Sequence, residues 1–452
     1  MYVNLKLTRQ AFQFSLHNIS IKIQVNTRRT NRMYRLTFAA ISKHLQLQIN
    51  RLLQRSVRFT AAQLPRPLAP GHDLVASQSA VPHVEEVRLV RLMLDYKLHK
   101  LEMGPDTLVA LTEREAALYY RQLVAIRRLE AAAAQLYREQ LVRGFCHLYT
   151  GQEACAVGLC AALRPQDNLI AGYRIHGWAY LMGVTAAAVL AELTGRASGC
   201  AQGKGGSMHM YAPNFYGGNG IVGAQISLGT GIALANKYRK NGAVCFALYG
   251  DGAANQGQIF ECYNMAQLWK LPIVFVCENN NYGMGTSAWR ASSNTNYYTR
   301  GDYLPGVWVD GQDVLAVRSA TRFAIEHAQQ RGPLVLELCT YRYAGHSMSD
   351  PGTSYRTREE VQQVRQRQDA IERFRKICLE MSLLTQTQLL GIERTVRDEM
   401  ELAIKAARTD VELPLSHLCN DVYAGSYAQL QLRGVLGHNL EHARSRTESC
   451  HE

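Results

Sequence analysis

The stretch Ala243-Val-Cys-Phe-Ala-Leu-Tyr-Gly-Asp-Gly252 decides the fold class of this chain. Its apolar part, residues 243–249, is an uninterrupted run, which is typical of a strand buried on both faces of a sheet. Similar runs at 273–277 and 334–338 predict two further buried strands, and helical patterns at 255–269 and 314–330 separate the three runs. Strands that alternate with helices predict an α/β fold with a doubly wound parallel sheet.

Polar clusters follow each of the three predicted strands. They read Gly250-Asp251-Gly252, Glu278-Asn279-Asn280-Asn281 and Gly345-His346-Ser347. Ligands in open α/β sheets bind beyond the carboxyl ends of the strands, where neighbouring strands bring their side chains together. We therefore expect the three clusters to face one site.

The first two clusters carry the ligand types of a magnesium site. Asp251 supplies a carboxylate and Asn280 an amide oxygen, and Mg²⁺ prefers such oxygen ligands and often shares them with phosphates. Gly252 and Ala253 leave the backbone N–H groups of the following turn free to meet a diphosphate. The alternative is a plain Asp-Gly turn beside an Asn-rich turn.

The composition excludes several classes of protein. The chain has 452 residues, of which 47% are hydrophobic and 19% charged, as in a folded protein. No run approaches the ~18 consecutive apolar residues of a membrane-spanning helix, so no membrane span is expected. Residues 1–72 hold twelve Lys and Arg and no acid, which leaves 38 basic against 37 acidic residues in the rest. A nucleic-acid partner would need basic charge clustered on the body, so none is expected.

The amino-terminal segment, residues 1–72, has the composition of an organellar presequence. Ile41, Leu45 and Ile49 recur at helical spacing, while Arg51 and Arg55 fall near another face. Such a basic amphipathic helix suits import into the mitochondrial matrix, and a disordered basic tail is the alternative. The predicted organisation is a presequence at 1–72, one folded domain at 73–425 and a divergent tail at 426–452.

Other patterns in the body are less specific. Residues 112–143 predict a helix, opened by Thr112 and Glu115 in capping-box spacing, and the charged run 356–375 predicts an exposed helical face. Residues 195–231 are dense in glycine, which indicates tightly turned backbone close to another group. Within them, Gly218-x-Gly220-x-x-Gly223 has dinucleotide-loop spacing, but it lacks the preceding strand and the following acid. The eleven cysteines form no C-x-x-C pair and are expected to be buried free thiols.

These motifs together resemble the alpha subunits of mitochondrial pyruvate dehydrogenase components. The spacing G-D-G-x(26)-N-N, from Gly250 to Asn280, is similar to the thiamine diphosphate signature of that family. The resemblance extends to Gly206-Ser-Met-His-Met210, to Asn214-Phe-Tyr-Gly-Gly-Asn-Gly-Ile-Val-Gly-Ala224 and to Gly345-His-Ser-Met-Ser-Asp-Pro-Gly352. It covers the chain from about 111 to about 423 and implies a thiamine diphosphate-binding fold.

The resemblance also assigns roles to individual residues. Thiamine diphosphate is implied to contact Tyr173, Arg174, Gly220, Val222, Asp251, Gly252, Ala253, Asn280, Tyr282 and His346. The implied Mg²⁺ ligands are Asp251, Asn280 and the carbonyl of Tyr282. The implied catalytic residues are His346 and His147, and the implied substrate contacts are His147, Tyr173, Arg174 and Ala212. The implied inhibitory phosphorylation sites are Ser347, Ser354 and Ser287. The loop that carries Ser347 and Ser354 is polar and contains Gly and Pro, so we expect its backbone to be exposed and only marginally ordered.

The implied reaction is the oxidative decarboxylation of pyruvate with transfer of the acetyl group to a lipoyl domain, which feeds acetyl-CoA synthesis. A beta subunit is the implied partner in an α2β2 assembly, because it supplies a glutamate that the cofactor needs. Further implied partners are a lipoyl-bearing acetyltransferase, a kinase and a phosphatase. Two alternatives stay open: a related 2-oxo acid or acetoin dehydrogenase alpha subunit, or a non-catalytic paralogue that binds the beta subunit. The second is motivated by Ala344, because the family loop commonly has histidine there.

Overall fold

The computed structural model describes residues 86–423 and the short segments 431–433 and 439–441. The predicted presequence at 1–72 and most of the predicted tail at 426–452 lie outside the described residues. Among the described residues, no helix is long and apolar enough to cross a membrane.

A six-stranded sheet lies at the centre of the described part, with the strand order β2-β9-β10-β6-β5-β4. Its strands are β2 (Lys97–His99), β4 (Asn168–Ile170), β5 (Cys245–Gly250), β6 (Ile273–Asn279), β9 (Gly306–Asp310) and β10 (Leu334–Cys339). All neighbours run parallel except β2, which pairs antiparallel with β9 at one edge. The predicted α/β fold is confirmed, and the antiparallel edge strand is an addition to it.

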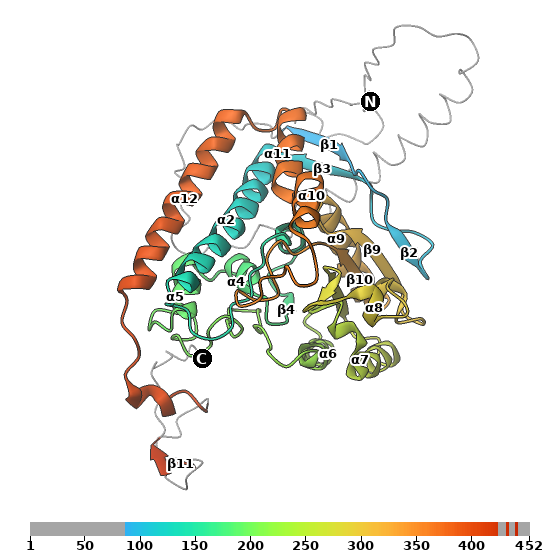
Figure 1. Cartoon of the computed structure of the whole chain (residues 1–452). Helices are drawn as coiled ribbons and strands as arrows, with labels where there is room; N and C mark the ends of the chain where they lie inside the picture. Colours follow the sequence, from blue (N-terminus) through green and yellow to red (C-terminus); the bar gives the residue numbers. More distant parts are fainter. Residues whose placement is uncertain (1–85, 424–430, 434–438, 442–452) are drawn as a thin grey trace, which may run out of the picture.

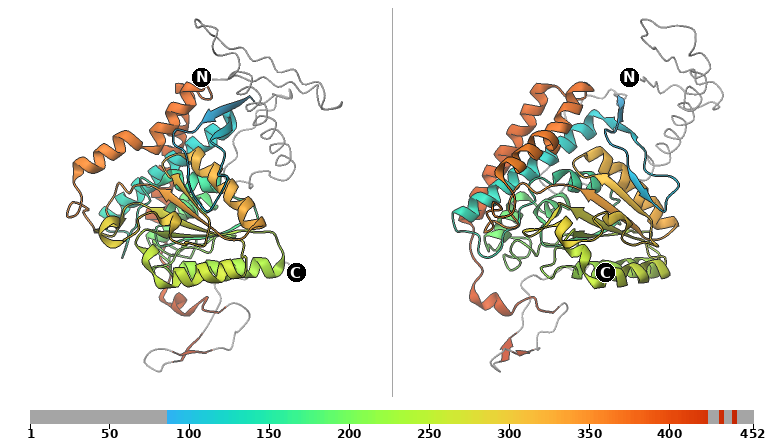
Figure 2. Two further views of the ribbon diagram at one scale, coloured as in Figure 1. Left: turned by 90° about the vertical axis from the view of Figure 1, so that its right-hand side faces the viewer. Right: turned by 45° about the vertical axis from the view of Figure 1, so that its right-hand side comes forward.

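Helices cover both faces of the sheet, as the two views of Figure 2 show. One face carries α3 (Glu153–Cys160) and α9 (Val314–Gln330), and the other carries α6 (Ala224–Arg239) and α7 (Gly257–Leu268). Strand β5 shows why both faces are apolar: Phe246 and Leu248 join the core on the α9 side, while Ala247 and Tyr249 join the core on the α6 side. This explains the uninterrupted apolar run, because successive side chains of a strand point to opposite faces.

A helical layer packs outside α3 and α9. Its members are α2 (Glu113–Arg138), α4 (His176–Leu181), α5 (Ala186–Leu193), α10 (Arg358–Gln368), α11 (Ala370–Glu380) and α12 (Gln386–Thr409). The two long helices α2 and α12 lie side by side along the molecule (Figure 1). Short elements complete the described part: β1 (Val87–Arg91), β3 (Leu108–Thr112), β7 (Tyr282–Gly283), β8 (Thr286–Ser287), α8 (Ala288–Ala291), β11 (Gln431–Arg433), β12 (Asn439–Glu441) and the 3-10 turns η2 (Ala253–Asn255), η3 (Tyr297–Thr299) and η4 (Leu415–Cys419).

Helix α2 begins where the capping box predicted. The Thr112 hydroxyl accepts from the Glu115 backbone at 3.2 Å, and the Glu115 carboxylate accepts from the Thr112 N–H at 3.1 Å. The helix ends at Arg138 rather than at residue 143, because Gln140 adopts a left-handed φ of 62° that α-helical hydrogen bonding does not tolerate.

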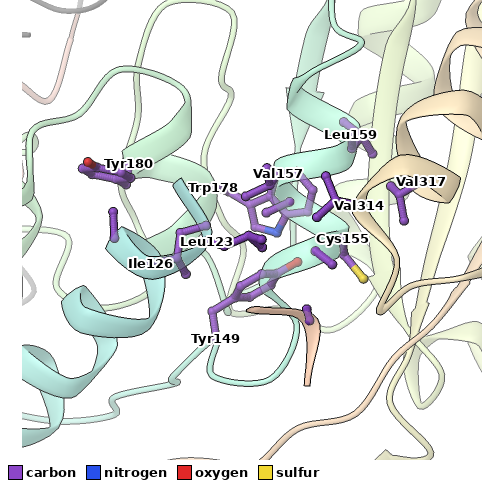
Figure 3. Packing of buried hydrophobic residues seen from close by; sticks show 14 of the residues in the cluster. Leu123, Ile126, Tyr149, Cys155, Val157, Leu159, Trp178, Tyr180, Val314 and Val317 are labelled. Carbon is purple, nitrogen blue, oxygen red and sulfur yellow. The ribbon is translucent and has the colours of Figure 1, made fainter. Parts of the chain in front are cut away.

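Close packing joins α3 to α9 and to the outer layer (Figure 3). A Cβ on Gly158 would lie 2.6 Å from the Val314 carbonyl and 2.6 Å from Val317 Cβ, so only glycine lets the two helices approach. On the other side of α3, the rings of Tyr149 and Trp178 meet edge to face at 5.8 Å. This core fixes the segment around Tyr149, which leads into the site described below.

Two further expectations need correction. The run 356–375 forms α10, which buries no residue, and part of α11, which buries Ala370 and Phe374, so only its first half is an exposed helix. Its first residue, Arg356, is buried. The ten cysteines of the described part are free thiols, as predicted, but four of them are only half-buried: Cys160, Cys200, Cys339 and Cys419.

Candidate cofactor and active site

The carboxyl ends of three neighbouring strands bring the predicted clusters to one edge of the sheet. In the parallel register, Gly250 of β5 lies opposite Glu278 of β6, and Cys339 of β10 lies opposite Asn279. Asp251 and Asn280 therefore leave adjacent strands at the same level. The chain after β10 leads from the same edge into the loop that carries His346.

Asp251 and Asn280 are both buried and in contact. Asp251 is 3% exposed, and its burial raises the pKa of the carboxyl to about 6, although hydrogen bonds from its own backbone and that of Asn280, together with the charge of Arg342, act in the opposite direction. Asn280 is oriented by a hydrogen bond from its Nδ2 to Gln152 Oε1 at 2.9 Å. A buried carboxylate beside an oriented amide is a site that a hard cation would stabilise.

Tyr282 closes this corner from the hairpin β7–β8. Its backbone N–H donates to Asn280 Oδ1 at 3.4 Å, and the turn between them is possible because Asn281 adopts a φ of 69°. Cβ atoms built on Gly252 and on Gly283 would each lie 3.2 Å from the other residue's Cα. Glycine at both positions thus lets the backbone after β5 approach the backbone of β7 closely, and no Cβ atom covers the main-chain groups there. No cluster of three or more His, Cys, Asp or Glu that could hold a metal occurs among the described residues, so a cation here would rely on carbonyl, amide and ligand oxygens besides Asp251.

Arg174 ties three segments of the site together. Its guanidinium donates to the Leu148 carbonyl at 2.6 Å and to the His346 carbonyl at 2.9 Å. Burial lowers the pKa of this guanidinium, and within residues 86–423 no carboxylate lies at ion-pair distance from it. The charges of Glu130 and Glu278 oppose this shift from a longer distance. A buried arginine without an ion-pair partner favours an anionic ligand.

Arg342 is a second buried cation, which the sequence reasoning missed. It is 1% exposed and donates to the carbonyls of Met284 and Ala344 and to the Tyr355 hydroxyl. Burial lowers its pKa to about 10, and the charge of Arg174 adds to this shift. The signal that could have found it is its position directly after β10, beside the polar cluster. The two arginines thus place two buried positive charges at this end of the sheet, close to the carboxyl groups of Asp251 and Glu278, and two such cations fit a diphosphate.

His147 and His346 form an aromatic cluster with Tyr173. The ring centroids lie 4.4 Å apart for His147 and Tyr173, 5.2 Å for the two histidines, and 5.4 Å for Tyr173 and His346. Burial lowers the pKa of His147 to about 3 and that of His346 to about 4, and the charge of Arg174 adds to both shifts. The Nδ1 atoms of both rings are buried without a hydrogen-bond partner. Two neutral imidazoles with unsatisfied polar atoms are poised to bind a polar ligand.

The glycine-dense segment lies beside Tyr173 and Arg174. The Asn219 N–H donates to the Gly172 carbonyl at 3.3 Å, and a Cβ on Gly218 would lie 2.6 Å from the same oxygen. Gly220 has no neighbour closer than 3.7 Å to its built Cβ, and Val222 is 43% exposed. This segment is therefore open toward the outside of the chain, and its contact with an aminopyrimidine stays a prediction.

The loop from Gly345 to Arg356 is organised by Asp350. Its carboxylate accepts from the His346 N–H at 2.6 Å, from the Gly352 N–H at 2.8 Å and from the Tyr355 hydroxyl at 2.6 Å. The Ala344 carbonyl accepts from Arg342 and Arg356, so the backbone role of this position does not depend on its side chain.

The three predicted phosphorylation sites differ in accessibility. Ser354 is exposed and Ser287 is half-buried in β8. Ser347 is only 7% exposed, with its hydroxyl 2.7 Å from that of Ser349. The expectation of a loosely held, exposed loop is therefore wrong at Ser347, because Asp350 gathers the surrounding backbone.

The structure brings most predicted site residues together. Ala253 is buried in η2, directly after the Asp251 turn. Ala212 pairs with Phe215 in a separate turn, and its contact with substrate stays a prediction. Apart from Ala212 and the outward-facing Gly220 and Val222, the predicted residues form a corner in which a buried carboxyl group, a buried arginine and two neutral histidines meet.

Comparisons with known proteins agree with this arrangement. The chain is 56% identical over 357 residues, 78% of this chain and 90% of the relative, to a probable pyruvate dehydrogenase E1 component subunit alpha, mitochondrial, of Caenorhabditis elegans. It is 58% identical over 335 residues to the type II alpha subunit of Ascaris suum, 74% of this chain and 86% of that one. It is 55% identical over 339 residues to the somatic form of Homo sapiens, 75% of this chain and 87% of that one. Residues 121–416 match the dehydrogenase E1 component family, and the chain belongs to this family.

Proposed function

We propose that this chain is the alpha subunit of a mitochondrial pyruvate dehydrogenase E1 component, which decarboxylates pyruvate oxidatively and transfers the acetyl group to a lipoyl domain. The relatives at 55–58% identity carry this activity in their names. The observation that carries the proposal is that Asp251 and Asn280 meet at the carboxyl ends of β5 and β6, while the buried Arg174 follows the neighbouring parallel strand β4. This pattern of oxygen ligands and buried cation suits a diphosphate cofactor with its metal.

Thiamine diphosphate is the cofactor that the family implies, and it supplies the carbanion-stabilising chemistry when bound. We propose that Asp251, Asn280 and the Tyr282 carbonyl hold Mg²⁺ beside its diphosphate. Arg174 binds the diphosphate, and the backbone at Gly252 and Ala253 contributes N–H groups. The buried positive charges of Arg174 and Arg342, neither of which forms an ion pair within the described residues, support an anionic ligand in this corner.

His147, His346 and Tyr173 are proposed to line the substrate side of the site. Burial keeps both imidazoles neutral at pH 7, so each ring can donate one hydrogen bond and accept another. Such groups can orient the substrate carboxylate and carbonyl, and can move a proton near the reacting carbon. The carboxylate of pyruvate would also meet the positive field of the neighbouring arginines.

A beta subunit is the proposed principal partner, in an α2β2 assembly. Apolar side chains that are exposed on the outer surfaces of α6 and α7 support it: Leu228, Leu234, Tyr238, Phe260, Leu268 and Trp269. Helices α6 and α7 pack against each other on the same face of the sheet (Figure 2). An apolar surface of this kind marks a protein contact. A lipoyl-bearing acetyltransferase, and a kinase and phosphatase acting at Ser347, Ser354 and Ser287, are further proposed partners.

The proposed organisation follows from the family and the sequence. Residues 1–72 are proposed to direct the chain to the mitochondrial matrix, because they are basic and free of acid. Residues 73–425 are proposed as the catalytic domain and 426–452 as a divergent tail.

The test is to co-express the chain with a beta subunit and to titrate thiamine diphosphate by calorimetry with and without Mg²⁺. We expect binding that depends on Mg²⁺, followed by release of CO2 from pyruvate. Binding that is indifferent to Mg²⁺ would contradict the metal assignment. Cofactor binding without turnover would favour the non-catalytic paralogue.

A further inference from the structure

A chain of buried polar groups lies behind the histidine cluster, and none of the roles above uses it. Glu130 of α2 and His176 of α4 are fully buried, and Ser207 of the glycine-dense segment is nearly so. Glu130 Oε2 lies 2.8 Å from His176 Nδ1, and His176 Nε2 lies 2.8 Å from Ser207 Oγ. Among the described residues, His176 is the one basic group within ion-pair distance of Glu130.

Both ends of this hydrogen-bonded series, Glu130 and Ser207, hold the backbone of the segment from His147 to Tyr149. Ser207 Oγ accepts from the His147 N–H at 3.2 Å, and Glu130 Oε1 accepts from the Tyr149 N–H at 2.9 Å. Between them, the Leu148 carbonyl accepts from Arg174. Successive backbone groups are thus held from three directions, and the His147 ring projects from the held segment toward Tyr173 and His346.

The hydrogen bonds have one consistent direction when His176 is neutral. A carboxylate can only accept, so the Nδ1–H of His176 donates to Glu130. His176 Nε2 then accepts, and the Ser207 hydroxyl donates to it while accepting from the His147 N–H. Every donor in this hydrogen-bonded series then meets an acceptor. Buried networks that are fully satisfied in this way are rigid, and the loss of one member is costly.

We propose that Glu130, His176 and Ser207 form a buried relay that positions His147 for catalysis; the inference rests on the proposed function. These three are positioning residues, because they hold the His147 backbone and do not touch the substrate site. A small displacement of a catalytic group lowers turnover strongly. The proposed metal ligands lie on other segments, and Arg174 of the proposed diphosphate site has a second hydrogen bond, to the His346 carbonyl, that does not involve the held segment. The relay therefore governs turnover more than cofactor affinity.

The test uses the α2β2 enzyme with the Ser207→Ala variant. The matched control is Ser319→Ala, which removes another buried serine hydroxyl, on α9 away from the site; this hydroxyl donates to the Asp106 carbonyl and also bonds the Tyr96 side chain. We expect Ser207→Ala to lower kcat by roughly 10- to 100-fold with unchanged thiamine diphosphate affinity, and to speed hydrogen–deuterium exchange in the peptide spanning 146–150. Ser319→Ala should leave all three values unchanged. Glu130→Gln keeps an acceptor for Tyr149 and should have a smaller effect than Ser207→Ala.

Several outcomes would overturn the relay. They are a wild-type kcat in Ser207→Ala, a loss of turnover that parallels a loss of cofactor affinity, and unchanged exchange at 146–150. Failure of the proposed function looks different, because the wild-type enzyme would then release no CO2 from pyruvate. In that case the exchange measurement alone decides whether the relay holds the segment.

Discussion

The burial of Asp251 is unfavourable for the unliganded chain, and we propose that this residue is nevertheless required for function. Its carboxylate is buried beside an amide and backbone N–H groups, and this burial raises its pKa. A cation would remove that disadvantage, since opposite charge favours the ionised form. The residue is thus adapted to the liganded state.

The Asp251→Asn variant separates these effects. We expect the affinity for thiamine diphosphate in the presence of Mg²⁺ to fall by at least about 100-fold, since even groups that only support metal ligands contribute 10–100-fold. Thermal stability without ligands should not fall, because an amide avoids a buried charge. Calorimetry and thermal unfolding of the assembled enzyme measure both, with the exposed Asp398→Asn as control. Normal affinity in a folded Asp251→Asn enzyme would refute the assignment.

The lowered pKa of His346 predicts that the stability of the folded chain depends on pH. The pKa of His346 is lowered to about 4 in the folded chain from an ordinary 6.5, so the unfolded chain binds more protons between these values. The stability that neutral His346 provides is therefore complete above about pH 6.5 and is lost as the pH falls toward 4. His346→Asn should flatten the fall in the unfolding midpoint of the cofactor-free enzyme across this range. Parallel curves for variant and wild type would contradict it.

At this scale, the sequence identified residues with a distinctive chemical neighbourhood and missed those whose role depends on long-range packing. Asp251 and Asn280 directly follow apolar runs that predict strands, so their placement at the carboxyl ends of those strands could be predicted from the sequence. Arg342 carried no prediction, and Arg356 was expected on an exposed helical face. Both are buried by hydrogen bonds to loop carbonyls, which only the tertiary structure reveals.

Among the helices and strands, those with a long, regular pattern of apolar residues could be predicted from the sequence, and those with a short pattern could not. Strands β5, β6 and β10 and helix α9 were predicted to within a few residues. Strand β4 escaped, because it spans only Asn168–Ile170 and starts with a buried Asn168 that is satisfied by Asn236 on α6. Strand β9 was not predicted either, because its apolar pattern is short: the strand spans only the five residues Gly306–Asp310.

The loop after β10 is the element whose order we expect to control activity. Ser347→Glu would put a second carboxylate near Asp350 in a buried position, which should break the hydrogen bonds that Asp350 makes to His346 and Tyr355. We expect a large loss of turnover and faster hydrogen–deuterium exchange across 343–356. Ser354→Glu, at an exposed position, should do less. Full turnover of Ser347→Glu, or equal effects at both positions, would contradict this account.

At the scale of the whole molecule, assembly should depend on the apolar surface over α6 and α7. Leu228 of α6 is 52% exposed and Leu402 of α12 is 70% exposed, so the two allow a matched comparison. We expect Leu228→Asp to reduce formation of the α2β2 enzyme in size-exclusion chromatography, because it places a charge in an apolar contact. Leu402→Asp should leave assembly unchanged. Normal assembly of the Leu228→Asp variant would show that the beta subunit does not bind at the surface over α6 and α7.

The whole chain is inactive by itself if the proposal is right, because its site opens outward at Gly220 and Val222 and lacks the glutamate of the beta subunit. The most direct test is therefore pyruvate-dependent acetylation of a lipoyl domain by the co-expressed α2β2 enzyme with thiamine diphosphate and Mg²⁺, compared with branched-chain 2-oxo acids and acetoin. The account predicts turnover with pyruvate, a strong preference for it, and no turnover by the alpha chain alone. An assembled, cofactor-bound enzyme that prefers another substrate, or that transfers no acetyl group, would contradict it.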